Sequence, residues 1–511
     1  MDLRTIWTEN IEQFGVYPLL MFEGKAYTNA DCEAWSSRLA HTLIELGVKP
    51  GDRVVVTMPN SPEVAIAFSG VIKAGAVVVP VLPLLQAQEL HYIFQDCEPK
   101  VVLTAEMLWM KVKEAANGLP SPPAVFTLDR PDSPHSLQRR IEQAPSTVPP
   151  LAISQGEAAA LLYTSGTTGE PKGVVLTHQN LYANAKAAAE MARLLQTEHE
   201  RVALGVLPIS HAFGFTMMNV ALLLGDQVVL LPYFEPKKVL KAIETHRVTH
   251  TAMVPAMFHA LCHEPEAGRY DTSSFIACVS GSASLPPSLA EQFERQFGCL
   301  ILEGYGLSEA APIVTATDPT KPIKRGSVGL PLPGVQVAVV DEHGRRLPPN
   351  EVGELIVSGP NVFQGYYKKE EETARTLRDG WLYTGDMARI DEDGYVFIVD
   401  RKKDVIIRGG FNIYPRDLEE LLLTHPAVVE AGVVGVPSPK MGEEVVAYVV
   451  VRRGENVTEE ELIRFCQQKV AKYKSPRFLK MVGYLPKNLL GKTDKKKLRE
   501  WAKEFAPAAR S

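Results

Sequence analysis

Short apolar runs that do not alternate with polar residues recur through the first half of this chain. They fall at residues 53–58, 76–81, 101–104, 228–231 and 248–253. A strand that is apolar on both faces fits a parallel sheet with helices on both sides. Residues 62–74 have the length of a helix and complete a βαβ unit, and we expect Asn60 and Ser61 to cap its start. These patterns predict an α/β fold with parallel-rich sheets.

The pattern changes after residue 326. Short strands at 335–340, 353–358 and 395–399 alternate with turns that contain Asp and Gly, which predicts a small antiparallel β-barrel or sheet. A compact α+β pattern follows, with helices at 415–424 and 458–470 and strands at 428–436 and 444–452. We therefore predict one domain over residues 1–400 and a second over residues 401–511. Residues 120–150 are rich in Pro and Ser and predict a loop or linker.

Composition excludes several classes of protein. Of the 511 residues, 45% are hydrophobic and 22% are charged, which is typical of a globular chain rather than a disordered one. None of the six cysteines forms a Cys-x-x-Cys pair, and such scattered thiols favour a reducing, cytoplasmic setting. The most apolar window, residues 64–85, is interrupted by Lys73, prolines and glycines, so no membrane span is expected. Peripheral association with lipid and a homodimer are left open.

Charge is distributed unevenly along the chain. Residues 401–511 carry 22 Lys and Arg against 14 Asp and Glu, a net charge of +8, whereas the first 400 residues carry 32 against 46, a net charge of −14. A basic C-terminal part predicts a polyanionic partner. Nucleic acid is not expected, because the basic residues are not interleaved with aromatics and no base-reading motif is present.

A polar, glycine-rich run follows an apolar strand at Tyr163. It holds four aliphatic hydroxyls, three glycines and Lys172 within eleven residues: Tyr163-Thr164-Ser165-Gly166-Thr167-Thr168-Gly169-Glu170-Pro171-Lys172-Gly173. Glycines let backbone N–H groups turn toward a phosphate, and the hydroxyls and the lysine add donors and charge. The run is not a Walker A loop, because Lys172 precedes Gly rather than Ser or Thr. It predicts a phosphate-binding loop of another kind.

This run resembles the phosphate loop of the adenylate-forming superfamily, which comprises acyl- and aryl-CoA synthetases, peptide-synthetase adenylation domains and beetle luciferases. Five further motifs follow in the order of that family: Gly281-Ser282-Ala283-Ser284-Leu285, Glu303-Gly304-Tyr305-Gly306-Leu307-Ser308-Glu309, Tyr383-Thr384-Gly385-Asp386, Asp400-Arg401-Lys402-Lys403-Asp404 and Gly491-Lys492. Six motifs in order are highly specific. Residues 301–315 and 398–420 resemble most the bacterial medium- and long-chain fatty acyl-CoA synthetases.

The resemblance implies both a fold and a reaction. The fold would have a large N-terminal domain of two α/β subdomains and a small β-barrel, followed by a small, mobile α+β C-terminal domain. The reaction would join a carboxylate to the α-phosphate of ATP with Mg²⁺, release pyrophosphate, and pass the acyl group to the thiol of coenzyme A. Charge that develops on the α-phosphoryl oxygens needs cations and hydrogen-bond donors there.

The resemblance also implies roles for residues at the nucleotide. Ser308 would point a hydroxyl toward the α-phosphate, Glu309 would ligate Mg²⁺, and Asp386 would hold the ribose hydroxyls with Arg401 nearby. The β- and γ-phosphates would be held by Thr164, Ser165, Gly166, Thr167, Thr168, Gly169 and Lys172. The adenine slot would be formed by Gly281, Ser282, Ala283, Glu303, Gly304, Gly306 and Tyr305, with Tyr305 stacking on the base.

Two half-reactions need different groups at one place. By resemblance, Lys492 would bridge the attacking carboxylate and the α-phosphate during adenylation. The C-terminal domain would then swing about Lys403 and bring Gly409 and Gly410 in to line the tunnel for the pantetheine arm. Glycines suit a narrow tunnel because the thiol arm must pass close to the backbone.

Residues 208–214 resemble the segment beside the acyl pocket of the family, in which His211 would lie near the carboxylate of the acid. By resemblance, the walls of the acyl pocket would be small or apolar: Phe213, Met253, Val254, Gly281 and Gly304. Acetyl-CoA synthetases carry a tryptophan at the position of Gly306, so glycine leaves room for a longer chain. These features predict a medium- or long-chain fatty acid. An aromatic acid such as a cinnamate remains the alternative.

Two other functions stay open at this point. The enzyme would load a carrier-protein phosphopantetheine if its acyl acceptor were not free coenzyme A. A non-catalytic nucleotide sensor is the second alternative, and the presence of Lys172, Glu309, Asp386 and Lys492 together argues against it.

Overall fold

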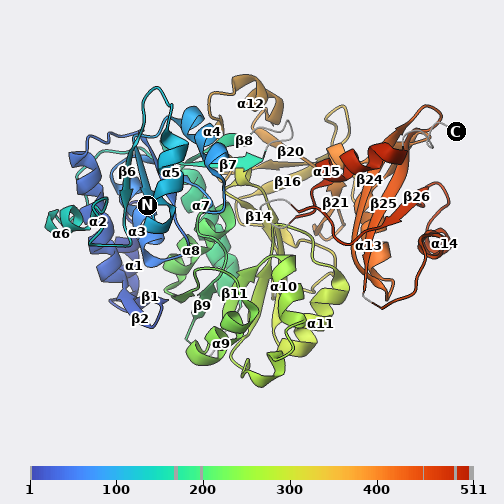
Figure 1. Ribbon diagram of the computed structural model, residues 1–511, viewed down its shortest axis with the longest axis horizontal. Helices are drawn as coiled ribbons and strands as arrows, with labels where there is room; N and C mark the ends of the chain where they lie inside the picture. Colours follow the sequence, from blue (N-terminus) through green and yellow to red (C-terminus); the bar gives the residue numbers. More distant parts are fainter. Residues whose placement is uncertain (1–2, 166–170, 196–199, 453, 488–491, 506–511) are drawn as a thin grey trace. The chain divides into compact units, whose positions relative to one another are not determined.

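The computed structural model describes residues 3–165, 171–195, 200–452, 454–487 and 492–505. The chain forms two compact units, one of Met1–Val337 with Val357–Leu382 and the other of Ala338–Ile356 with Tyr383–Ser511. Figure 1 shows the elements of both units coloured along the sequence. The predicted boundary between residues 400 and 401 stays a prediction.

A seven-stranded sheet holds the predicted phosphate loop in the first unit. Its order is β18-β8-β7-β4-β3-β5-β6, in which β6 through β7 run parallel and β8 and β18 are antiparallel. The strands are β3 (Arg53–Thr57), β4 (Val77–Pro80), β5 (Val101–Thr104), β6 (Ala124–Thr127), β7 (Ala158–Ser165), β8 (Pro171–Thr177) and β18 (Gly365–Tyr366). All residues of β4 and β5 are buried, which confirms the prediction that helices cover both faces of a parallel sheet.

A nine-stranded sheet of the first unit has the order β15-β14-β13-β12-β11-β9-β10-β1-β2. Its strands are parallel from β1 to β13, and its two edges are antiparallel. The strands are β1 (Pro18–Phe22), β2 (Lys25–Thr28), β9 (Val202–Gly205), β10 (Gln227–Leu230), β11 (His250–Met253), β12 (Ala277–Ser280), β13 (Leu300–Gly306), β14 (Ile313–Ala316) and β15 (Leu330–Pro331). The loops after β12 and β13 therefore leave the same edge of the sheet.

Two helices pack between these sheets. Helix α7 (His178–Arg193) contacts β7 and β8, α8 (Ala212–Leu224) contacts β9, and the two helices contact each other, as Figure 1 shows. The other helices of the unit are α1 (Ile6–Phe14), α2 (Asn29–Glu45), α3 (Pro62–Lys73), α4 (Ala87–Cys97), α5 (Trp109–Ala116), α6 (Gln138–Gln143), α9 (Pro236–His246), α10 (Pro255–Cys262), α11 (Pro287–Phe297) and α12 (Glu370–Thr376). Within the described part of the chain, none of the helices is both long and apolar enough to span a bilayer.

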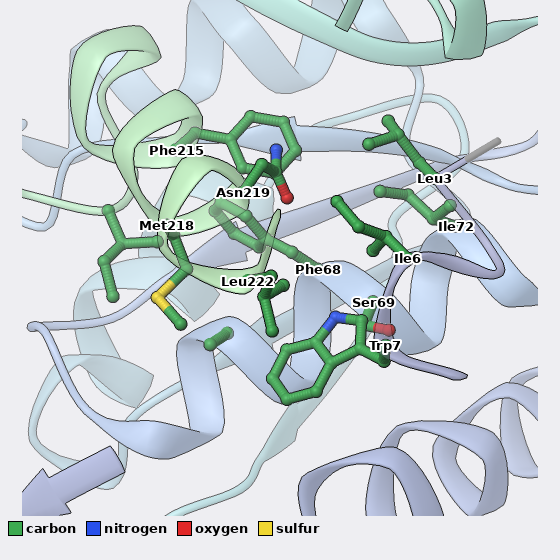
Figure 2. Close-up of a pocket in the computed structure, with 12 residues that line it drawn as sticks. Leu3, Ile6, Trp7, Phe68, Ser69, Ile72, Phe215, Met218, Asn219 and Leu222 are labelled. Carbon is green, nitrogen blue, oxygen red and sulfur yellow. The ribbon is translucent and has the colours of Figure 1, made fainter. Parts of the chain in front are cut away.

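A cavity of about 20 Å³ lies in the core between α1, α3 and α8. Figure 2 shows Phe215, Asn219 and Leu222 of α8 around it, together with side chains of α1 and α3. The Oγ atom of Ser69 and the Nδ2 atom of Asn219 line this cavity, and neither has a hydrogen-bond partner among the described residues. The volume suits one water molecule and is far too small for a nucleotide or an acyl chain.

The second unit contains an α+β sandwich. Its sheet has the order β23-β22-β25-β24, with β26 parallel to β25. These elements are β22 (Ile406–Arg408), β23 (Phe411–Ile413), β24 (Val428–Ser438), β25 (Gly442–Val451), β26 (Phe478–Met481), α13 (Pro415–Leu423), α14 (Glu459–Lys469) and α15 (Lys495–Ala502). Apolar side chains of α13 and α14 pack with Val433 and Val445, whereas those of α15 pack with Val434 and Val446. Alternate residues of β24 and β25 thus supply a core on each face.

The chain passes between the two units within a five-stranded antiparallel sheet. This sheet has the order β16-β17-β20-β19, with β21 paired to β20. Its strands are β16 (Gln336–Val340), β17 (Gly353–Ser358), β19 (Leu377–Arg378), β20 (Trp381–Ile390) and β21 (Val396–Arg401). The predicted fold class, with parallel-rich sheets, a small antiparallel β element and a small α+β C-terminal part, is confirmed.

Two local predictions are wrong. Residues 120–150 are not only a loop, because β6 adds to the parallel edge of the seven-stranded sheet and α6 follows it. Pro and Ser mark the turns around these elements but do not prevent a four-residue strand from pairing. Helix α3 begins after Ser61, whose side chain forms no capping hydrogen bond. The buried Asn60 side chain instead bonds to Leu207 O and to the N–H of Ile209, each at 2.8 Å.

One charge is buried completely in the first unit. The Lys73 side chain is 0% exposed, and its Nζ lies 2.5 Å from a carboxylate oxygen of Glu33 and 2.6 Å from the hydroxyl of Ser36. Burial lowers the pKa of Lys73, and Glu33 opposes that shift. The pair joins α2 to α3 and is stable only while both charges are present.

We expect Glu33→Gln to lower the free energy of unfolding of this unit by about 3–5 kcal/mol, because it leaves an uncompensated buried ammonium. Lys73→Met should cost less, because Glu33 is partly exposed and can still reach water. Thermal and urea unfolding of the three proteins tests this order. Lys100→Met, at an exposed position, is the control for loss of a lysine. A smaller effect of Glu33→Gln than of Lys73→Met would contradict the explanation.

Candidate active site

The run predicted to bind phosphate begins in β7 and ends in β8. These two strands pair antiparallel, with Thr164 opposite Lys172. Helix α4 contacts both strands: Tyr163 Oη donates to Asp96 at 2.5 Å, and Tyr92 Oη donates to the carbonyl of Pro171 at 3.1 Å. These bonds fix the residues at which the loop begins and ends. The predicted loop residues Gly166, Thr167, Thr168 and Gly169 lie outside the described residues, and for Ser165 only the strand is described.

Lys172 and Glu309 both lie beside Tyr366. The Lys172 side chain is 12% exposed and forms an ion pair with Glu372 of α12. Its Nζ lies 5.4 Å from the ring centroid of Tyr366, whose hydroxyl donates to Glu309 Oε1 at 2.8 Å. Burial lowers the pKa of Lys172, and the negative charge of Glu309 opposes that shift. The site therefore holds one ammonium against an aromatic face between two carboxylates.

The backbone around Glu309 is held in place by a later segment. Residues Ser308–Ala310 form a 3₁₀ turn after β13. The carbonyl of Glu309 accepts from the N–H of Phe363 at 2.9 Å, and the carbonyl of Ala310 accepts from Asn361 Nδ2 at 2.9 Å. One carboxylate in such a turn fits Mg²⁺, which binds through one or two protein carboxylates plus phosphate oxygens and water. No cluster of three His, Cys, Asp or Glu that would form a separate metal cage is found in the described ranges.

The residues predicted for the adenine slot lie at the carboxyl ends of neighbouring parallel strands. Ser280 of β12 is in register with Glu303 of β13, so the loop that carries Gly281, Ser282 and Ala283 and the strand end that carries Gly304, Tyr305 and Gly306 adjoin. Ser282 has a φ of +68°, a left-handed conformation that favours glycine. Carboxyl ends of parallel strands are where α/β sheets bind ligands.

Gly306 is required by a close backbone approach. A Cβ atom at this position would lie 2.1 Å from the carbonyl oxygen of Pro312. The N–H of Leu307, the next residue, donates to the same carbonyl at 2.9 Å. No side chain fits at residue 306 unless this turn moves, and the turn leads directly to Glu309.

His211 caps α8. Its ring Nδ1 accepts from the backbone N–H of Phe213 at 3.3 Å. The backbone N–H of His211 donates to the carbonyl of Pro208 at 3.0 Å. The hydrogen bonds of Asn60, just before the start of α3, to residues 207 and 209 fix the same segment. The sequence predicts Asn60 only as a helix cap. Its contact with a segment almost 150 positions away has no signal in the local sequence.

The predicted acyl-pocket walls are partly grouped. Phe213 and Val254 share one apolar cluster with Leu207 and Ala252, while Met253 belongs to the neighbouring core of the nine-stranded sheet. A Cβ atom at Gly281 would lie 3.0 Å from Cε1 of Phe213, so the ring packs against the glycine. The structure thus brings Phe213, Val254 and Gly281 together from three different elements.

The second unit gathers three of the predicted residues. Asp386 is 2% exposed, stands opposite Arg401 in the β20–β21 pair, and lies 2.7 Å from Arg401 Nε. Burial, aided by the positive charge of Arg401, lowers the pKa of Lys492 to about 8, whereas Asp386 opposes that shift. Lys492 is therefore partly neutral near physiological pH, an unusual state for a lysine.

Two other sets of contacts lie near Lys403, the predicted hinge, and near Gly409 and Gly410, the residues predicted to line the tunnel. Lys403 is exposed, and its neighbour Asp404 pairs with Arg499 of α15. Gly409 and Gly410 form the tip of the β22–β23 hairpin, with φ values of +59° and +83° that glycine adopts without strain. The N–H of Gly409 donates to the carbonyl of Met441 at 2.7 Å.

A buried carboxylate fixes the base of this hairpin. Glu444 is 1% exposed, lies 2.7 Å from Arg408 Nε, and accepts from Arg477 Nη1 at 2.8 Å. Phe411, on the far side of the two glycines, packs on Tyr473 with ring centroids 4.6 Å apart.

Comparison with known proteins assigns the chain to a family. Residues 7–367 match the AMP-binding enzyme family, and residues 417–492 match the AMP-binding enzyme C-terminal domain. The chain is 38% identical to a long-chain-fatty-acid–CoA ligase of Bacillus subtilis (strain 168), over 98% of this chain and 94% of that protein. It is 36% identical to a feruloyl-CoA synthase of an Amycolatopsis species, over 93% and 94% of the two chains.

A solved structure agrees with this assignment. The crystal structure of ATP-bound MatB from Rhodopseudomonas palustris superposes with a TM-score of 0.90 at 32% identity, and covers 99% of this chain and all of that one. Together with the matches over most of the sequence, this shows that the chain belongs to the AMP-binding enzyme family of the adenylate-forming superfamily.

Proposed function

We propose that a medium- or long-chain fatty acid is the acid that this adenylate-forming acyl-CoA ligase activates. In the first half-reaction a carboxylate oxygen of the acid attacks the α-phosphorus of ATP, and pyrophosphate leaves. In the second, the thiol of coenzyme A attacks the acyl carbonyl, and AMP leaves. The class of reaction belongs to the family, whereas the identity of the acid is specific to this chain.

The packing of apolar residues around Phe213 carries this proposal. Phe213 and Val254 lie in one apolar cluster, and Gly281 packs against the Phe213 ring. No charged side chain is among the predicted walls, so a second carboxylate or an ammonium on the substrate would find no partner there. Each methylene that such a surface buries contributes about 0.8 kcal/mol. The Bacillus subtilis relative named for long-chain fatty acids supports the same substrate.

An aromatic acid is the second candidate. The feruloyl-CoA synthase is nearly as similar in sequence as the fatty-acid ligase, and a flat ring can pack against Phe213 as an acyl chain can. The two candidates differ in how much chain the pocket accepts.

We assign the nucleotide roles as follows. Lys172 contacts the β- and γ-phosphates, Ser308 donates to the α-phosphate, and Tyr305 stacks on adenine. Asp386 accepts from the ribose hydroxyls, and Arg401 turns from Asp386 toward the nucleotide. Lys492 bridges the attacking carboxylate and the α-phosphate. Glu309 would hold Mg²⁺, which would supply positive charge to neutralise the leaving pyrophosphate.

We also propose that residues 401–511 move about Lys403 between the two half-reactions. Gly409 and Gly410 then contact the pantetheine arm in place of Lys492. The exposed hairpin tip, held from behind by Glu444, is suited to enter a narrow channel as a rigid element.

The substrate assignment is tested with acetate, octanoate, palmitate and ferulate, each with and without coenzyme A. We expect the rate of AMP formation to be highest with octanoate or palmitate and to depend on coenzyme A, because each added methylene is buried. Highest activity with ferulate would favour the aromatic candidate. Acid-dependent pyrophosphate exchange that coenzyme A does not discharge would favour a carrier-protein thiol as acceptor.

Lys492 gives a prediction on pH. Its lowered pKa of about 8 makes the side chain cationic below pH 8 and neutral above it. We therefore expect kcat/KM for acid-dependent pyrophosphate–ATP exchange to fall as pH rises through about 8. Without coenzyme A, the thiol does not titrate in the assay. Because the pH dependence of kcat/KM reports groups of the free enzyme, the fall in kcat/KM should reflect the pKa of Lys492.

Two variants separate Lys492 from other titrating groups. Lys492→Ala should lower the exchange rate by about 10²–10³-fold at pH 7, the usual cost of losing one donor at a developing charge. Lys492→Arg should be slow as well but should show no fall between pH 7 and 9.5, because guanidinium stays protonated. A falling limb that persists in Lys492→Arg would assign the titration to another group.

The acyl pocket is tested at Val254. We expect Val254→Phe to lower kcat/KM for palmitate at least tenfold more than for acetate, because the added ring fills space beside Phe213. Met257→Phe adds the same ring to the same cluster at a position that is not a predicted wall, and serves as the matched control. Equal losses for both acids, or equal effects of both variants, would place Val254 in the core rather than in the pocket.

A further inference from the structure

Glu372 forms an ion pair with Lys172 that no sequence motif indicates. It lies in α12, some 200 residues after Lys172, and its side chain is 28% exposed. The two other groups around the ammonium, Tyr366 and Glu309, bond to each other. Glu372 therefore supplies the direct counter-charge to Lys172 in the nucleotide-free protein.

A polyphosphate chain competes with this ion pair. The phosphate oxygens of ATP and the carboxylate of Glu372 are both anionic acceptors for the same ammonium. A carboxylate in contact with Lys172 would also lie against the incoming charge, which costs free energy in a site partly shielded from water. The ion pair between Glu372 and Lys172 therefore weakens the binding of a pyrophosphate group, and a bound pyrophosphate group weakens the ion pair.

The surrounding cations fit an exchange of partners. Lys369 caps the start of α12 and Arg375 lies in its last turn, and their charges act on the pKa of Lys172 in the direction opposite to that of Glu309. Arg375 lies 3.5 Å from the exposed Glu371. Lys369 and Arg375 stand three residues before and three residues after Glu372, the spacing at which side chains on a helix can meet. A carboxylate that leaves Lys172 would therefore have a cation within reach on the same segment.

We propose that Glu372 is a displaceable counter-ion, which holds Lys172 in the nucleotide-free protein and gives it up to the polyphosphate of ATP. This inference rests on the proposed role of Lys172 in phosphate binding. The ion pair keeps a half-buried ammonium in place at the cost of some affinity for ATP. After adenylation the carboxylate competes with pyrophosphate for Lys172, which favours release of that product.

Calorimetric binding of magnesium pyrophosphate and of AMP to the full chain tests this. Glu372→Gln is isosteric and removes the competing charge, so it should tighten pyrophosphate binding roughly three- to thirtyfold and leave AMP binding unchanged. Glu370→Gln is the matched control, because it removes the same charge from an exposed position on the same helix turn. It should change pyrophosphate binding less than twofold.

A double-mutant cycle identifies the route of the effect. In a Lys172→Ala background, Glu372→Gln should no longer tighten pyrophosphate binding, because its partner is gone. An equal gain in that background would mean that Glu372 repels phosphate directly, which would overturn the counter-ion proposal. Glu372→Asp retracts the carboxylate by one methylene and should give a gain between those of wild type and Glu372→Gln.

Pyrophosphate binding to these variants distinguishes the role of Lys172 from that of Glu372. If Lys172→Ala binds pyrophosphate as tightly as wild type does, the role of Lys172 in phosphate binding is wrong. If Lys172→Ala loses binding but Glu372→Gln behaves like Glu370→Gln, or binds more weakly, the phosphate role stands and the counter-ion proposal is overturned.

Discussion

A charged side chain that leaves water must meet an opposite charge, and this requirement organises the groups that await the nucleotide. Lys172 meets Glu372 beside the phosphate loop, and Arg401 meets Asp386 at the position predicted for the ribose. Each of these pairs lies within a single unit. In the function proposed above, the nucleotide takes the place of one partner in each pair.

The fold was largely predictable because its strongest signals are local. The strands β3, β4 and β5 are continuous apolar runs, and their burial on both faces follows from that composition alone. The prediction failed for β6 and α6, where Pro and Ser dominate the pattern and pairing with β5 decides the structure. A four-residue edge strand has too little periodicity to be recognised without its neighbour.

The candidate site was predictable in its motifs and not in its contacts. The run that holds Lys172 suits phosphate by its residue types alone, whereas the roles predicted for Glu309 and Asp386 come from the resemblance to the adenylate-forming superfamily. Glu372 and Asn60 were missed because each acts on a segment far away in the sequence, and a single acidic or amide residue on a helix carries no signal of its own. The lowered pKa of Lys492 results from its burial in the folded chain. The sequence around it is basic and gives no sign that this lysine is buried.

The contact between Gly306 and the carbonyl of Pro312 has a consequence for how substrate range can diverge in this chain. Any side chain at residue 306 displaces the turn that leads to Glu309, so a substitution there that is meant to alter the proposed acyl pocket would also disturb the residue proposed to hold Mg²⁺. Val254 lies on a different element and is not coupled in this way. In this chain, a substitution at Val254 is therefore expected to alter the proposed acyl pocket without moving the turn at Glu309, whereas a substitution at residue 306 moves both together.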